Sequence, residues 1–241
     1  SRRLRDLRAL GFAPVQAIFD AVLPGGPIIA PPGLVIRFLG EPTVLVDGIE
    51  LPTSAWKSKK ALEVLRYLAV RDGWVGREQV IEAVWPERSP AQGRTLLRSA
   101  LSEIRRVLEP GRTPGEPSRF VTTERTRVAV AAATDLGEAE AAMGRSDHAT
   151  AFSVLVMGLG ELGSVGEWGE ELARHVDRRR LEAAERVATD AASPQRREAL
   201  ELLTDLEPWQ REHVDALAAL HRSVGDEAAA RAVERRWFDD E

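Results

Sequence analysis

Positively charged side chains gather in one stretch of this chain. All three lysines, Lys57, Lys59 and Lys60, fall within four residues, and an arginine-rich segment follows from Arg94 to Glu109. Ammonium and guanidinium groups bind anions, and a local concentration of them is typical of a surface that contacts nucleic-acid phosphates. The chemistry indicated by these residue types is therefore the binding of a polyanion.

The net charge of the whole chain conceals this concentration. The 241 residues include 33 basic and 38 acidic side chains, which gives a net charge of -5. Residues 34–131 hold 16 basic and 12 acidic side chains (+4), residues 132–241 hold 13 and 24 (-11), and residues 1–33 hold 4 and 2 (+2). A basic part followed by an acidic part predicts two domains with different partners.

Composition also excludes several classes of protein. Cysteine is absent, so neither disulfides nor thiol chemistry is available. No apolar run approaches the roughly 18 residues that cross a bilayer, and residues 1–10 lack the apolar centre of a signal peptide. We therefore expect a cytoplasmic protein without a membrane partner. Because the chain starts with Ser1 and enters a helix-like stretch, we also expect a longer protein to continue ahead of it.

The hydrophobic pattern predicts the elements that position the basic residues. Residues 3–23 predict one or two helices, and the prolines and glycines of 24–33 predict a linker, so 1–33 is interpreted as the end of an upstream region. The next segment predicts two strands (34–40, 43–46), three helices (58–70, 77–85, 90–108) and a hairpin (120–123, 126–131). This order is typical of a winged helix-turn-helix, whose third helix enters the major groove.

The third predicted helix has two chemically different faces. At about 100° per residue, one face collects Leu97, Leu101, Ile104 and Leu108, and the opposite face collects Thr95, Arg98, Ser99, Ser102 and Arg106. Arginine can make paired bonds to guanine or phosphate, and serine or threonine can bond a backbone oxygen or a base edge. A solvated helix face has a similar composition, but this helix is the one that a winged helix presents to DNA.

Two flanking groups extend the predicted interface. The lysines precede or begin the first helix, where they can reach phosphates without reading sequence, and Arg94 lies near the start of the third helix. Arg125 and Arg127 lie at the tip of the hairpin, where a wing can meet the backbone or the minor groove. A solubilising helix end and exposed hairpin charges are the alternative interpretations.

Residues 34–131 resemble the DNA-binding domain of the Streptomyces antibiotic regulatory protein family, a branch of the response-regulator winged helices. The matching stretches are LVIRFLGEPTVLVDGIELP, KKALEVLRYLAV, GREQVIEAVWPERSPAQGRTLLRSALSEIRRVLEPG and FVTTERTRVAV. The resemblance adds Arg105, in the run 102–106, to the candidate DNA contacts. The chain departs from the family at Glu103, where arginine is usual, and at Thr126-Arg127, where Gly-Tyr is usual. The Glu103 carboxylate can either face the groove or pair with Arg106.

Residues 135–241 resemble the bacterial transcriptional activator domain that follows the winged helix in this family. The likeness rests on Gly166-Glu167-Trp168 before a long helix to about Ala192, and on Glu207-Pro208-Trp209 through Ala228. The implied fold class is mainly α with little β, a winged helix-turn-helix followed by tetratricopeptide-like helix pairs that offer a concave surface. The implied partners are double-stranded promoter DNA with direct repeats and RNA polymerase holoenzyme. A homodimer, or an upstream sensor domain in the same chain, is a further expected contact.

No enzyme site is predicted. Residues 158–163 fit the glycine pattern of dinucleotide-binding proteins, and Asp177 follows the first glycine by nineteen residues. Asp177 nevertheless falls within a helical pattern, and no later strands complete a parallel sheet. The histidines lack metal-like spacing, so we expect no metal site. Together with the argument against a dinucleotide site, this leads us to expect no cofactor and no catalytic residue. The chain is predicted to be a DNA-binding transcriptional activator, and the alternative is a protein-interaction module whose winged helix has lost specific DNA binding.

Overall fold

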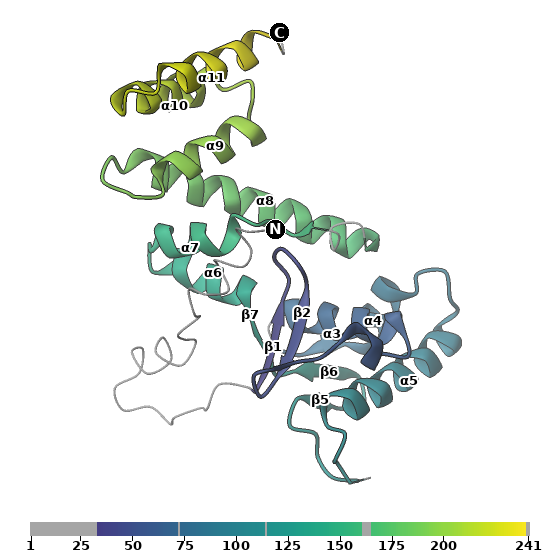
Figure 1. Cartoon of the computed structure of the whole chain (residues 1–241). Helices are drawn as coiled ribbons and strands as arrows, with labels where there is room; N and C mark the ends of the chain where they lie inside the picture. Colours follow the sequence, from purple (N-terminus) through teal and green to yellow (C-terminus); the bar gives the residue numbers. More distant parts are fainter. Residues whose placement is uncertain (1–32, 72, 114, 161–164, 240–241) are drawn as a thin grey trace.

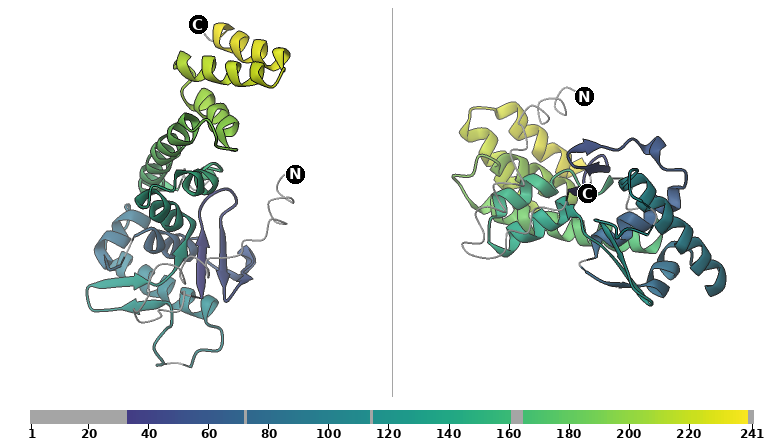
Figure 2. Two further views of the ribbon diagram at one scale, coloured as in Figure 1. Left: turned by 90° about the vertical axis from the view of Figure 1, so that its left-hand side faces the viewer. Right: turned by 90° about the horizontal axis from the view of Figure 1, so that it is seen from below.

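The computed structural model describes residues 33–71, 73–113, 115–160 and 165–239 (Figure 1). The predicted helix at 3–23 and almost all of the linker at 24–33 lie outside the described residues. The described chain forms a small α/β body, from which a stack of helices extends (Figures 1 and 2). This confirms the predicted fold class, mainly α with a small amount of β.

A four-stranded sheet opens the α/β body. Its strands are β1 (Leu34–Arg37), β2 (Thr43–Val46), β3 (Ile49–Glu50) and β7 (Ala133–Thr134), in the order β3-β2-β1-β7. Strands β1 to β3 pair antiparallel, whereas β7 pairs with β1 in parallel. The two-residue strands β3 and β7 were not predicted, because so short a segment shows no alternation of polar and apolar residues.

The predicted first strand at 34–40 is too long. The backbone N–H groups of Phe38 and Leu39 donate to the carboxylate of Asp135 at 2.9 Å instead of to a neighbouring strand. Gly40 then turns the chain with a φ of 69°, a conformation that glycine adopts without steric cost. The strand therefore ends at Arg37 because a distant side chain takes its next donors.

Three helices form the centre of the α/β body: α3 (Lys59–Val70), α4 (Arg77–Val84) and α5 (Pro90–Leu108). Ser58 caps α3, since its hydroxyl accepts from Ala61 N. Ser89 and Gln92 form a reciprocal capping box at α5, with Pro90 in the first helical position. All three predicted helices are confirmed to within a residue, and the leucine face of α5 is buried as expected.

Helices α4 and α5 approach closely at a glycine. A β-carbon added to Gly93 of α5 would lie 2.2 Å from the Cγ2 atom of Ile81 on α4. Contacts under 3.0 Å are essentially never found for real β-carbons. Gly93 is thus required by packing rather than by backbone conformation, and it sets the spacing between α5 and α4.

The predicted hairpin forms a wing. It consists of β5 (Val121–Thr123) and β6 (Arg127–Val130), and the short strand β4 (Val75–Gly76) completes a sheet in the order β4-β6-β5. Strand β4 is another two-residue element that the sequence pattern did not reveal. The wing sheet therefore contains a strand from the segment between α3 and α4 in addition to the two strands of the hairpin.

The remaining helices stack in chain order. They are α6 (Asp135–Gly144), α7 (His148–Leu155), α8 (Gly166–Thr189), α9 (Arg196–Leu206), α10 (Arg211–Ser223) and α11 (Glu227–Asp239). Each packs on the next (Figure 1), which is the tetratricopeptide-like arrangement that was predicted. The predicted long helix ends at Thr189 rather than near Ala192. No described helix has an apolar window long enough to cross a membrane.

The hydrophobic core continues from the winged helix into these helices. The ring of Tyr67 on α3 meets the ring of Trp168 on α8 edge to face, with centroids 5.6 Å apart. Gly40 N also donates to Gly158 O at 2.9 Å. The two halves therefore share a packed contact, and the predicted boundary between 131 and 135 falls at strand β7, which pairs with β1. The division into separate domains stays a prediction.

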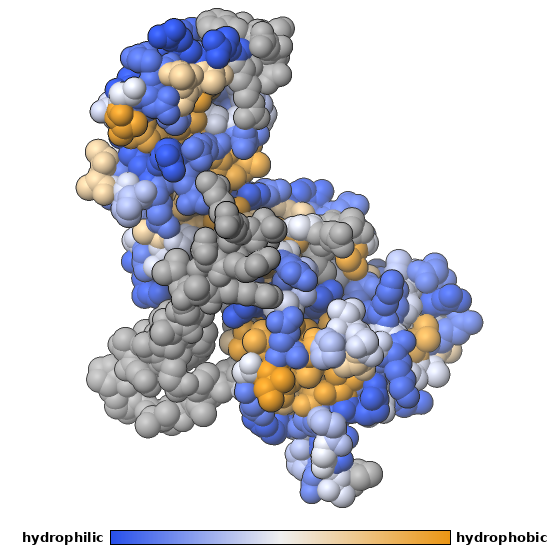
Figure 3. Space-filling model, viewed as in Figure 1, coloured by the Kyte–Doolittle hydropathy of each residue, from blue (hydrophilic) through white to orange (hydrophobic). Residues whose placement is uncertain are grey.

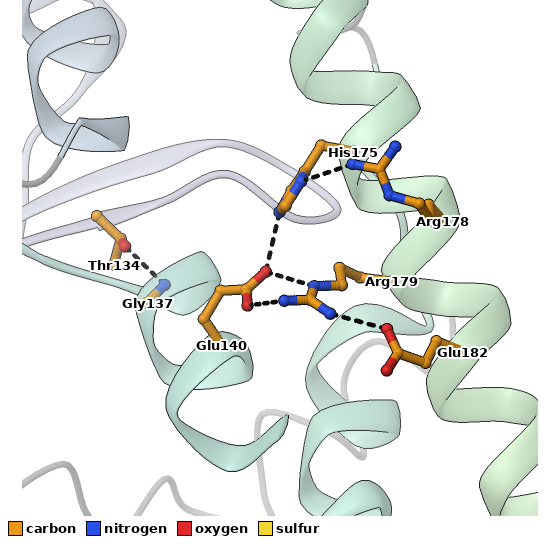
Figure 4. A network of polar contacts seen from close by, with 7 residues as sticks. All are labelled: Thr134, Gly137, Glu140, His175, Arg178, Arg179 and Glu182. Carbon is orange, nitrogen blue, oxygen red and sulfur yellow. Dashed lines mark hydrogen bonds and ion pairs between the residues drawn. The ribbon is translucent and has the colours of Figure 1, made fainter. Parts of the chain in front are cut away.

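A polar network joins α6 to α8 (Figure 4). The guanidinium of Arg179 makes two bonds to the carboxylate of Glu140, at 2.9 and 2.6 Å, and a third to Glu182 at 2.8 Å. The ring of His175 also lies 2.9 Å from Glu140. These bonds, first that from Arg179, hold the pKa of Glu140 below its usual value of 4.5.

Candidate nucleic-acid interface

The predicted DNA-facing side of α5 is exposed. Thr95, Arg98, Ser99, Ser102 and Arg106 are all accessible, while the leucine face is buried. The end of the molecule that carries α5 is mainly hydrophilic, whereas a hydrophobic area lies over the first sheet (Figure 3). The structure therefore confirms that these five side chains share one accessible helix face, which we call the α5 stripe.

The donors of the α5 stripe differ in what they already bind. Within the described ranges, the side chains of Arg98, Ser99 and Ser102 make no hydrogen bond or ion pair. The Thr95 hydroxyl instead donates to Ala91 O at 3.3 Å. Arg98 is thus a guanidinium held on a helix face with its hydrogen-bonding capacity unused, as recognition of an external acceptor requires.

Arg94 lies beside the α5 stripe but is already paired. Its Nε atom donates to the carboxylate of Glu78 on α4 at 3.1 Å. Both side chains are exposed, and an exposed pair of this kind is worth little in water. The arginine can therefore exchange this partner for a phosphate at small cost.

Glu103, the main departure from the family pattern, lies at the edge of the α5 stripe, in a hollow that Arg98, Ser99, Ser102 and Arg106 also line. Its side chain is only 15% exposed, and Oε1 accepts the backbone N–H of Ser58 at 2.9 Å. Arg106 Nη2 lies 3.9 Å from the same oxygen and 3.5 Å from Ala55 O. Of the two predicted alternatives, the pairing of Glu103 with Arg106 is present but long at 3.9 Å, and the shorter contact is with Ser58 before α3, which the sequence did not reveal.

The lysines form two groups. Lys57 and Lys59 are exposed and make no hydrogen bond or ion pair with the described part of the chain. Lys60 Nζ donates to Val84 O at 2.8 Å and pairs with Glu63 at 2.9 Å, so it joins α3 to the end of α4. Cations at a helix N-terminus oppose the helix dipole. A contribution to the stability of α3 therefore does not explain why lysines occupy positions 57 and 59.

The wing arginines also differ from each other. Arg125, at the tip, is exposed and has no partner among the described residues. Arg127 pairs with Glu124 at 2.7 Å and lies over the ring of Trp74, 4.6 Å from its centroid. The hydrogen bond between Arg127 and Glu124 raises the pKa of the arginine and lowers that of the carboxyl. Arg125 is thus the cation at the wing tip that can bind an external anion without first breaking a contact to another described residue.

Arg105 lies on the flank of α5 that faces the wing. It is half-buried, and Nη2 donates to the hydroxyl of Thr123 on β5 at 3.2 Å. Nearby, Arg77 Nε donates to Glu124 O at 3.1 Å and Arg77 N donates to Thr126 O at 2.9 Å. The sequence did not indicate Arg77, because only the fold brings the first residue of α4 against the wing.

The described residues give no support to a cofactor or metal site. They contain no group of three or more histidines, aspartates or glutamates placed to hold a metal ion. Asp177 lies within α8 and pairs with Arg180 at 3.1 Å, and the apolar segment before Gly158 belongs to helix α7 rather than to a strand. The strand-turn-helix that a dinucleotide fingerprint requires is therefore not formed there.

Comparison with solved structures shows a shared fold. Mycobacterium tuberculosis EmbR, solved in complex with a low affinity phosphopeptide, is similar to this chain with a TM-score of 0.56 and 20% sequence identity. The similarity covers 85% of this chain and 59% of EmbR, so the chain spans only part of the length of that protein. No protein-family model matches the sequence, and no curated protein sequence matches it.

Proposed function

We propose that this chain is a sequence-specific DNA-binding transcriptional regulator and not an enzyme. The observation that carries the proposal is the α5 stripe, in which Arg98, Ser99 and Ser102 are exposed without internal partners on the third helix of a winged helix. Polar side chains with unused donors are suited to base edges and phosphate oxygens. The fold likeness to EmbR is compatible with this architecture.

In the proposed complex α5 lies in the major groove. Arg98 supplies paired donors to a guanine edge, and Ser99 and Ser102 contact base edges or the backbone. Lys57 and Lys59, at the N-terminal end of α3, neutralise phosphates without reading sequence. Arg125 at the wing tip reaches the backbone or the adjacent minor groove.

The finer assignment rests on the family resemblance. The Streptomyces antibiotic regulatory proteins imply short direct repeats at a promoter, activation rather than repression, and recruitment of RNA polymerase. The helical stack α6 to α11 is then the part that contacts polymerase or a second copy of the chain. A cytoplasmic location belongs to the same proposal.

Gel retardation of the full chain on mixed-sequence duplex DNA at low salt tests the proposal. We expect retention that weakens linearly on a plot of log affinity against log salt, because each neutralised phosphate releases counterions. Selection from randomised duplexes should then yield a preferred sequence. The matched variants are Arg98→Ala, which removes the unpaired guanidinium of the α5 stripe, and Arg197→Ala on α9, which removes one charge far from it.

A protein-interaction module that no longer binds DNA is the second candidate. It is favoured by the carboxylates that lie against three of the predicted DNA-contacting arginines, namely Glu78 at Arg94, Glu103 at Arg106 and Glu124 at Arg127. The overall charge of -5 points the same way. Absence of retention at low salt would favour this candidate, whereas retention without any selected sequence would leave only nonspecific DNA binding.

A further inference from the structure

Three arginines from separate segments meet at the base of the wing. Arg77 is the first residue of α4, Arg105 lies in the last turn of α5, and Arg112 lies in the loop that follows α5. All three are half-buried. Because Arg77 and Arg105 donate to the adjacent wing residues Glu124 and Thr123, their guanidinium groups reach the same point on the wing.

These arginines lie close enough to repel one another. Burial is the main cause that lowers the pKa of Arg105, and the positive charges of Arg112 and Arg77 lower it further. Glu109 offsets part of this effect. Arg105 therefore lies in a partly desolvated position beside the positive charges of Arg77 and Arg112.

No carboxylate forms an ion pair with any of the three in the described part of the chain. Their acceptors are neutral: the Thr123 hydroxyl for Arg105, Glu124 O for Arg77, and Glu116 O, at 2.6 Å, for Arg112. The nearby carboxylates are occupied, since Glu109 accepts from Ser118 Oγ and Arg119 N, and Glu124 accepts from Arg127. The fold thus holds three cations together with no directly paired carboxylate among the described residues and with Glu109 as a partial counter-charge, an arrangement suited to binding an anion.

We infer that Arg77, Arg105 and Arg112 form a clamp for one backbone phosphate of duplex DNA. The inference rests on the proposed function and goes beyond the α5 stripe, because the clamp lies between α5 and the wing. Each DNA strand's sugar-phosphate backbone separates the major groove from the minor groove. When α5 occupies the major groove and the wing reaches the adjacent minor groove, the residues between them face that backbone.

The salt dependence of binding by the full chain tests the clamp. Arg77→Gln and Arg112→Gln should each reduce the slope of log affinity against log salt. The whole clamp accounts for about 0.9 of that slope, the value for one neutralised phosphate, so a tenfold rise in salt costs a variant without the clamp about eightfold less affinity than it costs the wild type. The loss should be equal on selected and mixed-sequence duplexes, because a phosphate contact carries no base information. Arg77→Lys retains the charge and should keep the wild-type slope.

Arg197→Gln is the matched control for net charge. Its side chain is 66% exposed on α9 and pairs with Glu201, so the slope should remain that of the wild type. A slope that stays unchanged in both Arg77→Gln and Arg112→Gln, while the wild type binds DNA, would overturn the clamp and leave the proposed function standing. A wild type that does not bind duplex DNA would overturn the proposed function and the DNA assignment of the clamp together.

Thermal unfolding of the free chain gives a second readout that does not need DNA. At equal ionic strength, potassium phosphate should raise the melting temperature of the wild type more than potassium chloride does, and the double variant Arg77→Gln, Arg112→Gln should lose this difference. Stabilisation by phosphate with unchanged DNA slopes would overturn the DNA assignment and identify a site for a free phosphate. The absence of any specific stabilisation, together with unchanged slopes, would overturn the site itself.

Discussion

The carboxylate of Glu103 on α5 accepts the backbone N–H of Ser58 at 2.9 Å, and Ser58 is the residue that caps α3. The contact joins α5 to the N-terminal end of α3, where Lys57 precedes the cap and Lys59 is the first helical residue. A carboxylate also complements the positive end of the α3 dipole. The departure of Glu103 from the family pattern therefore has a structural role within the fold.

Glu103→Gln should preserve this contact, since the amide oxygen can still accept from Ser58 N. Glu103→Ala leaves that N–H without its partner, and we expect it to lower the free energy of unfolding by about 1 to 2 kcal/mol. Denaturant titration of both variants measures the difference. In DNA selection, Glu103→Gln should bind more tightly without a change in preferred sequence, and a changed preference at one base pair would place the carboxylate in the groove.

Arg98 and Lys57 should have different effects on DNA binding. Arg98→Ala should cost on the order of 1 to 3 kcal/mol on the selected sequence and relax the preference at one position, because it removes a paired base contact. Lys57→Ala should weaken all sequences alike. Affinities on selected and random duplexes measure both effects. Equal losses for Arg98→Ala on the two duplexes would show that the α5 stripe does not read bases through this residue.

Gly93→Ala should destabilise the fold although alanine favours a helix. The exchange gains about 1 kcal/mol in helix propensity. It also places a β-carbon 2.2 Å from Ile81 Cγ2, and overpacking of this kind costs about 1 to 3 kcal/mol. We expect a lower melting temperature, measured by circular dichroism. The double variant Gly93→Ala, Ile81→Val shortens the opposing side chain and should recover part of the loss.

The bond between Glu140 and Arg179 should make stability depend on pH. The pKa of Glu140 is held below its usual 4.5, so its contribution is present above that value and is lost as pH falls through the lower folded-state pKa. Glu140→Gln should therefore lower the melting temperature at pH 7, and the difference from the wild type should shrink in acid. A difference that stays constant from pH 7 to pH 3 would contradict this role.

A fragment that ends at Ala133 should be less stable than the full chain. It loses the carboxylate of Asp135 that accepts from Phe38 and Leu39, and it loses Trp168, which covers Tyr67. Calorimetry of the fragment and the full chain measures the difference. A fragment with an unchanged melting temperature would show that the winged helix is an independent domain, as the charge pattern of the sequence predicts.

Local patterns were enough to predict most elements of the fold. The apolar repeat of α5 and its Ser89 cap lie within a few residues of one another, so helix limits and the buried face followed from the sequence alone. The same repeat predicted that Arg98, Ser99 and Ser102 share the opposite, exposed face. The lysine cluster was also visible, because adjacent charges need no tertiary contact to be recognised.

Only the tertiary structure decided which charges are paired and which are available. Strand β1 ends early because Asp135, ninety-seven residues after Phe38, takes its donor. Glu103 accepts from Ser58, and Arg94 donates to Glu78. Arg105 lies near Arg77 at the wing. Arg98, in contrast, has no partner among the described residues. Residue type and helical spacing fix the direction in which a side chain leaves its helix. The group that it meets depends on chain segments brought there by folding, and this information is not local in the sequence.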